Sequence, residues 1–249
     1  MKGINALALV AAVCLITASG AQGEYIYAIQ GDVLYAVQTD TGEWAELSES
    51  WEGTELMTSI NGSLFSIQGD VLYRLSRDGS WTELTDTWTG SVALTAGDEW
   101  LYAVQSDILY RIDPDDGTWE IVPGIYNGTT HIAWSGGALM VIQNDVLYRT
   151  NPVTGNFTEL PSSYSGTTAT AATATDFFAI QGDVLYKVNP RTGDYENLGG
   201  GYEGATEMAA YGNYVYCIWQ GALWKIDTRT GEYESLGSGW EGTTAFCIL

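Results

Sequence analysis

Short apolar runs alternate with turn-forming residues along the chain from Tyr25 onward. Between Gly53 and Leu84, four such runs occupy residues 54–60, 64–67, 71–75 and 81–84. Asn-Gly separates the first two runs, and Gly-Asp and Asp-Gly pairs lie between the later ones. Asn-Gly is a strong two-residue hairpin signal, and the other pairs also favour tight turns. The pattern predicts four short antiparallel strands, and the same part of the chain has no helical periodicity.

This unit recurs six times. Its most regular part is the phrase Gln-Gly-Asp-Val-Leu-Tyr at residues 30–35, which returns with small changes and has drifted most in the sixth copy, Trp219–Trp224. The leucine of the phrase stands at positions 34, 72, 109, 147, 185 and 223, a spacing of 37 or 38 residues. A fixed period of this length is typical of a repeat architecture.

A single four-stranded unit cannot bury both faces of its sheet, whereas a radial arrangement packs each sheet between two neighbours. The sequence therefore predicts an all-β fold, a six-bladed β-propeller of four-stranded antiparallel blades. The first run, residues 25–29, has the pattern of a second strand, and residues 242–249 have the pattern of a first strand. We expect the C-terminal strand to complete the first blade, which removes two exposed strand edges.

The order of strands and turns, with its repeated Leu-Tyr-Arg, Thr-Gly and Trp elements, resembles that of secreted bacterial repeat β-propellers over residues 25–249. It is similar in outline to six-bladed kelch-type propellers, with Gln-Gly-Asp in place of their double glycine. It also resembles lectin propellers with tectonin-like or tachylectin-like repeats. These resemblances imply the propeller fold.

The N-terminus has the pattern of a secretory signal peptide. Lys2 precedes an apolar run at residues 6–17, and the small residues Ala18-Ser19-Gly20-Ala21 follow. This order predicts cleavage after Ala21, so that residues 1–21 are the signal peptide and residues 22–249 the exported propeller, extracellular or periplasmic.

The chain is strongly acidic. It has 31 Asp and Glu residues against 9 Lys and Arg residues, for a net charge of −22. Nucleic acids and anionic membranes favour basic surfaces, so neither is an expected partner. After the N-terminal run no apolar stretch is long enough to cross a bilayer, and we expect no membrane insertion.

Residues suited to catalysis or metal binding form no recognisable motif. His131 is the only histidine and lies on a predicted strand. The Asp of the repeated phrase occurs once per blade, in a turn, and the acidic loop 113–117 lacks the ligand pattern of a calcium loop. We expect no catalytic residue, no metal site and no cofactor.

An aromatic residue, one further residue and a glycine precede each predicted first strand. First strands line the axis of a propeller, so these rings gather at one end of it. They either stack on sugars or pack between adjacent blades. The six are Trp51, Trp88, Tyr126, Tyr164, Tyr202 and Trp240.

A second aromatic series lies on the predicted outer strands, where we expect it to pack against the neighbouring blade. Its members are Trp44, Trp81, Trp119, Phe157, Tyr195 and Tyr233.

Two cysteines follow the predicted cleavage site, Cys217 and Cys247. Strand alternation places them on opposite faces of blades six and one, which touch through opposite faces. The sequence leaves open a disulfide across this closure or two buried thiols.

Together these features predict a secreted, non-catalytic binding module. Our functional hypothesis is carbohydrate binding through the aromatic residues that precede the first strands. The alternative is a structural or protein-interaction subunit of an extracellular assembly, including self-association. A hydrolase or lyase on a propeller scaffold is the third hypothesis, because one fold hosts many functions.

Overall fold

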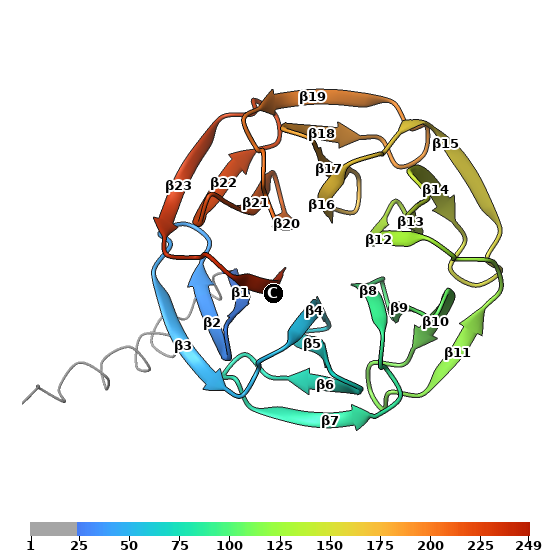
Figure 1. The fold of residues 1–249 in the computed structure, drawn as a ribbon, viewed down its shortest axis with the longest axis horizontal. Coiled ribbons are helices and arrows are strands. Elements are labelled where there is room, and N and C mark those ends of the chain that lie inside the picture. Colours follow the sequence, from blue (N-terminus) through green and yellow to red (C-terminus); the bar gives the residue numbers. More distant parts are fainter. Residues whose placement is uncertain (1–23) are drawn as a thin grey trace, which may run out of the picture.

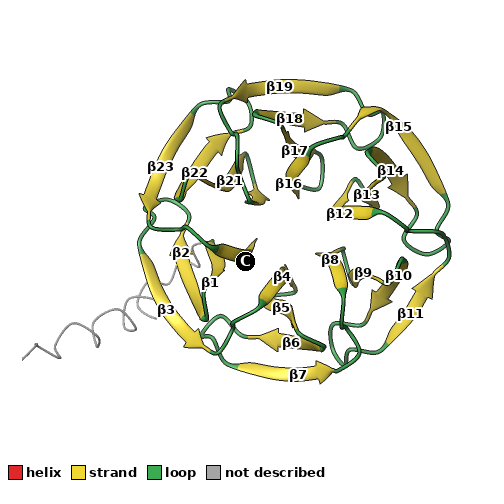
Figure 2. Cartoon of the chain, viewed as in Figure 1, coloured by secondary structure: helices red, strands yellow, loops and turns green. Residues whose placement is uncertain are grey.

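The computed structural model describes residues 24–249, which form six four-stranded antiparallel sheets arranged in a ring (Figure 1). Every regular element in this range is a strand (Figure 2). The all-β, six-bladed propeller prediction is therefore confirmed. The predicted signal peptide lies outside the described residues. No helix within the described range is long and apolar enough to span a membrane.

Each blade is a meander from an innermost strand at the axis to an outermost strand at the rim. Blade 1 consists of β24 (Thr243–Ile248), β1 (Tyr25–Gln30), β2 (Val33–Gln38) and β3 (Trp44–Glu49). Blade 2 consists of β4 (Thr54–Ile60), β5 (Ser63–Gln68), β6 (Val71–Leu75) and β7 (Trp81–Thr85). Blade 3 consists of β8 (Ser91–Ala96), β9 (Leu101–Gln105), β10 (Ile108–Ile112) and β11 (Trp119–Val122).

The second half of the ring repeats this order. Blade 4 consists of β12 (Thr129–Ser135), β13 (Ala138–Gln143), β14 (Val146–Thr150) and β15 (Phe157–Ser163). Blade 5 consists of β16 (Thr167–Ala172), β17 (Phe177–Gln181), β18 (Val184–Val188) and β19 (Tyr195–Gly200). Blade 6 consists of β20 (Glu207–Tyr211), β21 (Tyr214–Trp219), β22 (Ala222–Asp227) and β23 (Tyr233–Ser238).

The C-terminal strand closes the ring as predicted. Strand β24 pairs antiparallel with β1, with Tyr27 opposite Cys247 and Ala28 opposite Phe246. The backbone N–H groups of Tyr25 and Leu249 each donate to the other residue's carbonyl, at 3.1 and 2.9 Å. Blade 1 therefore gains an innermost strand, and β1 keeps no free edge facing the axis.

The hydrophobic core is divided into six clusters, one in each seam between adjacent blades. The seam between blades 6 and 1, which closes the ring, is an example. There Ile218 and Leu223 of blade 6 pack with Ile26 and Phe246 of blade 1. Both faces of each sheet are thus covered, since strand alternation sends side chains to the two neighbouring seams.

The turns between the third and fourth strands of the blades require the glycine of their Thr-Gly pair, because they pack closely on the preceding blade. Gly155 has a φ of 70°, and a β-carbon there would collide with the carbonyl oxygen of Pro123 at the end of the preceding blade. Gly42 and Gly231 make the same close approach to Leu236 and Leu198. Glycine lets each turn lie directly on the outer strand of the blade before it.

Candidate functional site

The six aromatic residues that precede the innermost strands are buried. Their exposed fractions are 1 to 5%, and each belongs to the core cluster of one seam. A ring enclosed in this way offers no face to a sugar. The packing alternative therefore describes Trp51, Trp88, Tyr126, Tyr164, Tyr202 and Trp240, and the sugar-stacking role expected for them is corrected on the ground of their burial.

Side chains of the repeated phrase hold these rings in place. Around Trp88, Gln105 Nε2 donates to the carbonyl oxygens of Thr87 and Thr89 at 2.6 and 2.9 Å. The backbone N–H of Trp88 donates to the carbonyl of Asp70, in the blade before, at 2.9 Å. The loop is thus fixed by the turn of one blade and the glutamine of the next.

The same glutamine clamp recurs in four further seams. The donors there are Gln30, Gln68, Gln143 and Gln181, each to the carbonyls that flank the buried ring. In the sixth copy the indole Nε1 of Trp219 donates to the carbonyl of Glu203 at 3.0 Å instead. The first residue of the phrase therefore has a structural role between repeats.

The aromatic side chains of the outermost strands are the exposed ones. Trp44 is 56% exposed, Trp81 50% and Trp119 47%, and Phe157, Tyr195 and Tyr233 lie at 64, 59 and 53%. The expectation that they pack against the neighbouring blade is wrong. Each packs against the aromatic residue of the repeated phrase on the adjacent strand of its own blade. Trp81 and Tyr233 also lie near the buried rings of Trp51 and Tyr202, at 6.4 and 6.3 Å between centroids.

In blades 1, 2, 3 and 6 the exposed ring is the outer end of an aromatic contact chain that starts at the buried ring of a seam. In blades 4 and 5 the exposed ring pairs with the tyrosine of the repeated phrase. In blade 2, Tyr73 lies edge to face against buried Trp51 at 5.6 Å and against exposed Trp81 at 5.4 Å between ring centroids. In blade 3, Tyr110 joins Trp88 to Trp119 at 5.5 and 5.2 Å. Edge-to-face contacts of this kind fix ring orientation, so the exposed rings are held rather than free.

A groove lies between blades 4 and 5, beside the pair of Tyr186 and Tyr195. Its volume is ≈ 320 Å³, and Tyr164, Tyr186 and Tyr195 are among the residues that line it. Tyr186 and Tyr195 meet edge to face at 5.6 Å, and the edge of Tyr164 reaches the same groove. Gln181 and the hydroxyls of Ser162 and Ser163 add hydrogen-bonding groups.

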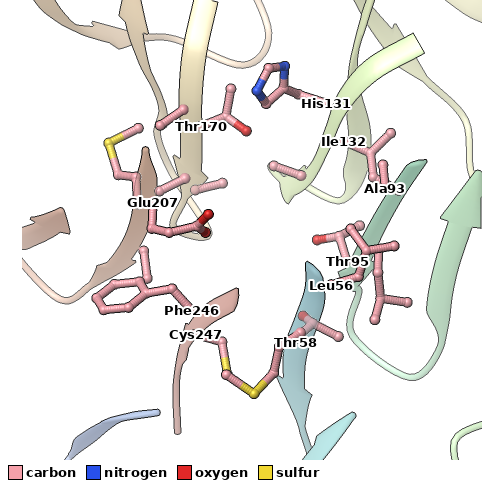
Figure 3. A pocket seen from close by; sticks show the side chains of 18 of the residues that line it. Leu56, Thr58, Ala93, Thr95, His131, Ile132, Thr170, Glu207, Phe246 and Cys247 are labelled. Carbon is pink, nitrogen blue, oxygen red and sulfur yellow. The ribbon is translucent and has the colours of Figure 1, made fainter. Parts of the chain in front are cut away.

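A second cavity lies on the axis, enclosed by the innermost strands of all six blades. Its volume is ≈ 380 Å³, and its walls carry threonine, alanine and aliphatic side chains (Figure 3). Glu207 and His131 project into it from β20 and β12 (Figure 3). Burial raises the pKa of Glu207 to about 8 and lowers the pKa of His131.

The two cysteines form no disulfide; both are free and buried. Cys217 packs in the seam between blades 5 and 6, and Cys247 in the seam between blades 1 and 2. The two cysteines lie on opposite faces of their blades, as expected from strand alternation. Both of these faces point away from the seam between blades 6 and 1, so the thiols do not meet. The buried-thiol alternative is correct, and burial raises the pKa of Cys217 to about 12.

The aspartates of the acidic turns are exposed or accept hydrogen bonds within their own turn. The repeated aspartates, for example Asp32 and Asp70, are exposed. In the loop 113–117, the Asp113 carboxylate accepts from the N–H of Asp115 at 2.8 Å, and that of Asp116 accepts from Thr118 N–H and hydroxyl groups at 2.9 and 2.7 Å. Within residues 24–249 no three His, Cys, Asp or Glu side chains are grouped to hold a metal ion.

The sequence analysis missed one residue of the axial cavity. The channel carboxylate Glu207 stands where the other innermost strands carry Leu56, Ala93, His131, Ala169 and Ala245. A charged residue in an otherwise apolar or neutral repeat position was the available signal. The outermost aromatic residues were identified from the sequence, but their exposed fractions of 47 to 64% were not expected.

Comparison with known proteins supports the fold alone. No protein-family model and no curated protein matches the chain. Among solved structures, a chain in the crystal structure of a nidogen/laminin complex is similar, with a TM-score of 0.76 at 11% sequence identity. The match covers 91% of this chain and 98% of that one. The shared feature is the propeller architecture.

Proposed function

We propose that this protein is an exported, multivalent binding module whose ligands are carbohydrates held on the outer strands. The observation that carries the proposal is the set of six half-exposed aromatic rings, one at the same place in every blade. Pyranose rings have an apolar C–H face that packs on an aromatic ring, while their hydroxyls bond to polar neighbours. The fixed orientation of the exposed rings suits such packing.

The groove between blades 4 and 5 is the best-formed instance. Tyr186 and Tyr195 supply ring faces and hydroxyls, and Gln181 supplies the oxygen of its amide, since its Nε2 already donates to two backbone carbonyls. A pocket with aromatic walls and a few polar groups is the usual form of a small-ligand site. Six weak sites, one on each blade of the propeller, would give avidity for a polymeric or surface-bound glycan.

The experiment compares binding of the protein to immobilised polysaccharides and to the matching short oligosaccharides. In the test variant all six outer rings are replaced by serine: Trp44, Trp81, Trp119, Phe157, Tyr195 and Tyr233. The control variant is Ile125→Ser with Val153→Ser, two apolar side chains that are 80 and 57% exposed outside this set. We expect the test variant to lose roughly tenfold or more in apparent affinity, and the control to retain it.

Absence of binding to every glycan by the folded wild-type protein would refute the carbohydrate assignment. So would equal loss in both variants, because a general decrease in surface hydrophobicity would then suffice. Circular dichroism and thermal unfolding of each variant verify that the propeller is intact.

A basic protein partner is the second candidate, favoured by the carboxylates beside the rings. Every outermost strand carries an exposed glutamate next to or near its aromatic residue: Glu46, Glu83, Glu120, Glu159, Glu196 and Glu234. The similar propeller belongs to a complex of two proteins. The dependence of affinity on ionic strength distinguishes a basic protein partner from a glycan. Association through these carboxylates weakens steeply as ionic strength rises, whereas stacking of a neutral sugar does not.

A further inference from the structure

The axial cavity differs from the outer surface in both shape and chemistry. Its ≈ 380 Å³ are bounded by threonine hydroxyls, such as those of Thr58, Thr95 and Thr170, and by aliphatic side chains, such as Leu56 and Ile132 (Figure 3). A cavity of this size holds a small organic molecule, and its walls offer both hydroxyl groups and apolar contacts.

One carboxylate projects into this cavity without a partner. Within the described residues, Glu207 takes part in no ion pair, and no hydrogen bond to its carboxylate is formed. The other titratable groups of the lining are Glu55, which is exposed, His131 and the thiol of Cys247. No lysine or arginine lines the cavity, and the neighbouring strands β16 and β24 present no charged side chain to it.

We propose that the axial cavity binds a small, free alkylamine in its protonated form, with the ammonium group at the carboxylate of Glu207. An ammonium has three donors and no acceptor, so it pairs with the carboxylate and with nearby threonine hydroxyls. The alkyl chain then lies against the aliphatic wall that includes Leu56 and Ile132. This site is independent of the outer-strand surface and of its ligand.

A metal ion fits the cavity less well than an organic cation. Ca²⁺ takes six to eight oxygen ligands and usually several carboxylates. Here a single enclosed carboxylate is present, and no group of three acidic, histidine or cysteine side chains gathers within residues 24–249. The aliphatic part of the wall would also stay unused by a metal ion.

The charge of the whole chain favours entry of a cation. A net charge of −22 gives a negative potential, and a low-dielectric channel concentrates such a field. Burial raises the pKa of Glu207 to about 8, so the carboxylate becomes charged as the pH rises through that value. Burial keeps His131 neutral over the same range by lowering its pKa, so the site gains negative charge with pH.

Calorimetric titration of the full chain with n-pentylamine tests the proposal. The amine keeps its charge up to a pH of about 10, so its own titration does not interfere between about pH 6.5 and about pH 8.5. We expect the affinity to rise roughly tenfold or more over this interval as Glu207 ionises. The neutral analogue 1-pentanol, which lacks the charge, is expected to bind more weakly and with no such rise.

Two matched variants locate the site. Glu207→Gln removes the carboxylate and is expected to lower the affinity for pentylamine roughly tenfold or more. The affinity of this variant should also no longer depend on pH. Glu55→Gln removes the exposed carboxylate of the lining and is expected to change the affinity less than about twofold. Glu207→Asp, which keeps the charge, should retain part of the affinity, and thermal unfolding shows whether each variant is folded.

Three results would overturn the proposal. The first is the absence of pentylamine binding by the wild-type protein at concentrations up to about 10 mM. A dissociation constant above this value is too high for a specific small-ligand site. The second is equal binding by Glu207→Gln and wild type. The third is tighter binding by a lysine-containing tripeptide than by pentylamine, which would assign the ammonium to a side chain of a partner protein.

Discussion

The side-chain amide of Gln68 clamps the loop that carries Trp51. Its Nε2 donates to the carbonyl oxygens of Ser50 and Glu52, on either side of the ring residue, each at 2.9 Å. The glutamine belongs to blade 2 and the loop leads out of blade 1, so the two hydrogen bonds connect successive repeats. The burial of Trp51 thus depends on a residue of the next strand pair.

Replacing Gln68 by methionine should destabilise the propeller. The change keeps the length of the side chain and removes the donor, so two carbonyls lose their partner. We expect the free energy of unfolding to fall by about 1 kcal/mol, since water reaches part of this site. Urea unfolding followed by fluorescence measures it.

The control for this prediction is Gln38→Met. Gln38 makes only side-chain contacts of 3.3 and 3.4 Å with Thr41 and Glu43 at the surface, so its loss should cost much less. Equal losses in the two variants would mean that the clamp contributes no stability.

Truncation should destabilise the protein far more in the buried aromatic series than in the exposed one. Trp88 is 1% exposed, and Trp88→Ala leaves a cavity in the seam between blades 2 and 3. We expect it to cost about 3–5 kcal/mol of unfolding free energy. Trp81 is 50% exposed, and Trp81→Ala should cost about 1 kcal/mol, the value of its edge-to-face contact with Tyr73.

Chemical denaturation of both variants gives the comparison. A loss for Trp81→Ala as large as that for Trp88→Ala would show that the outer ring is part of the core. It would then not be available to a ligand.

Local patterns predict the strands of this protein almost completely. The run 54–60 is β4 without change, and 71–75 is β6, because alternation and turn residues act over a few positions. Closure by the C-terminal strand also follows from the pattern alone. The number of blades follows from the repeat count.

Relations between repeats are harder to predict. Alternation assigns Cys217 and Cys247 to opposite faces, but the direction in which the blades succeed one another decides which seam each face meets. The aromatic-x-Gly rings are buried through glutamines of the following blade. The environment of Glu207 depends on the width of the channel, which six strands from the whole chain define together.

Gly155 should tolerate no side chain. Its φ of 70° costs an L-residue about 1–2 kcal/mol, and a β-carbon would also collide with the carbonyl of Pro123. We expect Gly155→Ala to lower the free energy of unfolding by roughly 3 kcal/mol or more, because blades 3 and 4 must separate slightly. Thermal and urea unfolding report the loss.

Gly62→Ala provides the matched control. Gly62 has a φ of 79°, and open space surrounds the position of its β-carbon. Its variant should show only the backbone cost, about 1–2 kcal/mol. A loss for Gly155→Ala no larger than this would contradict the close packing of turn on strand.

The two cysteines should be inert in the folded protein. Both are buried, and burial raises the pKa of each thiol, so little thiolate forms near neutral pH. We expect no alkylation of Cys217 or Cys247 under native conditions and complete alkylation in denaturant, measured by peptide mass spectrometry. Addition of a reducing agent should leave the Tm unchanged, whereas a lower Tm would indicate a disulfide.

The enclosed carboxyl of Glu207 should make stability depend on pH. Its pKa is about 8 in the folded protein against an ordinary value of 4.5, so between these values the folded state binds a proton that the unfolded state has released. Its contribution to the free energy of unfolding is therefore largest below pH 4.5, falls as the pH rises toward 8 and is constant above. Glu207→Gln lacks this decrease, so the free energy of unfolding of the variant should gain on that of wild type by up to about 5 kcal/mol across the interval. Urea unfolding at several pH values measures the difference, with Thr170→Val as a channel variant that alters no titratable group. A difference between Glu207→Gln and wild type that stays constant with pH would show that this carboxyl is solvated as in water.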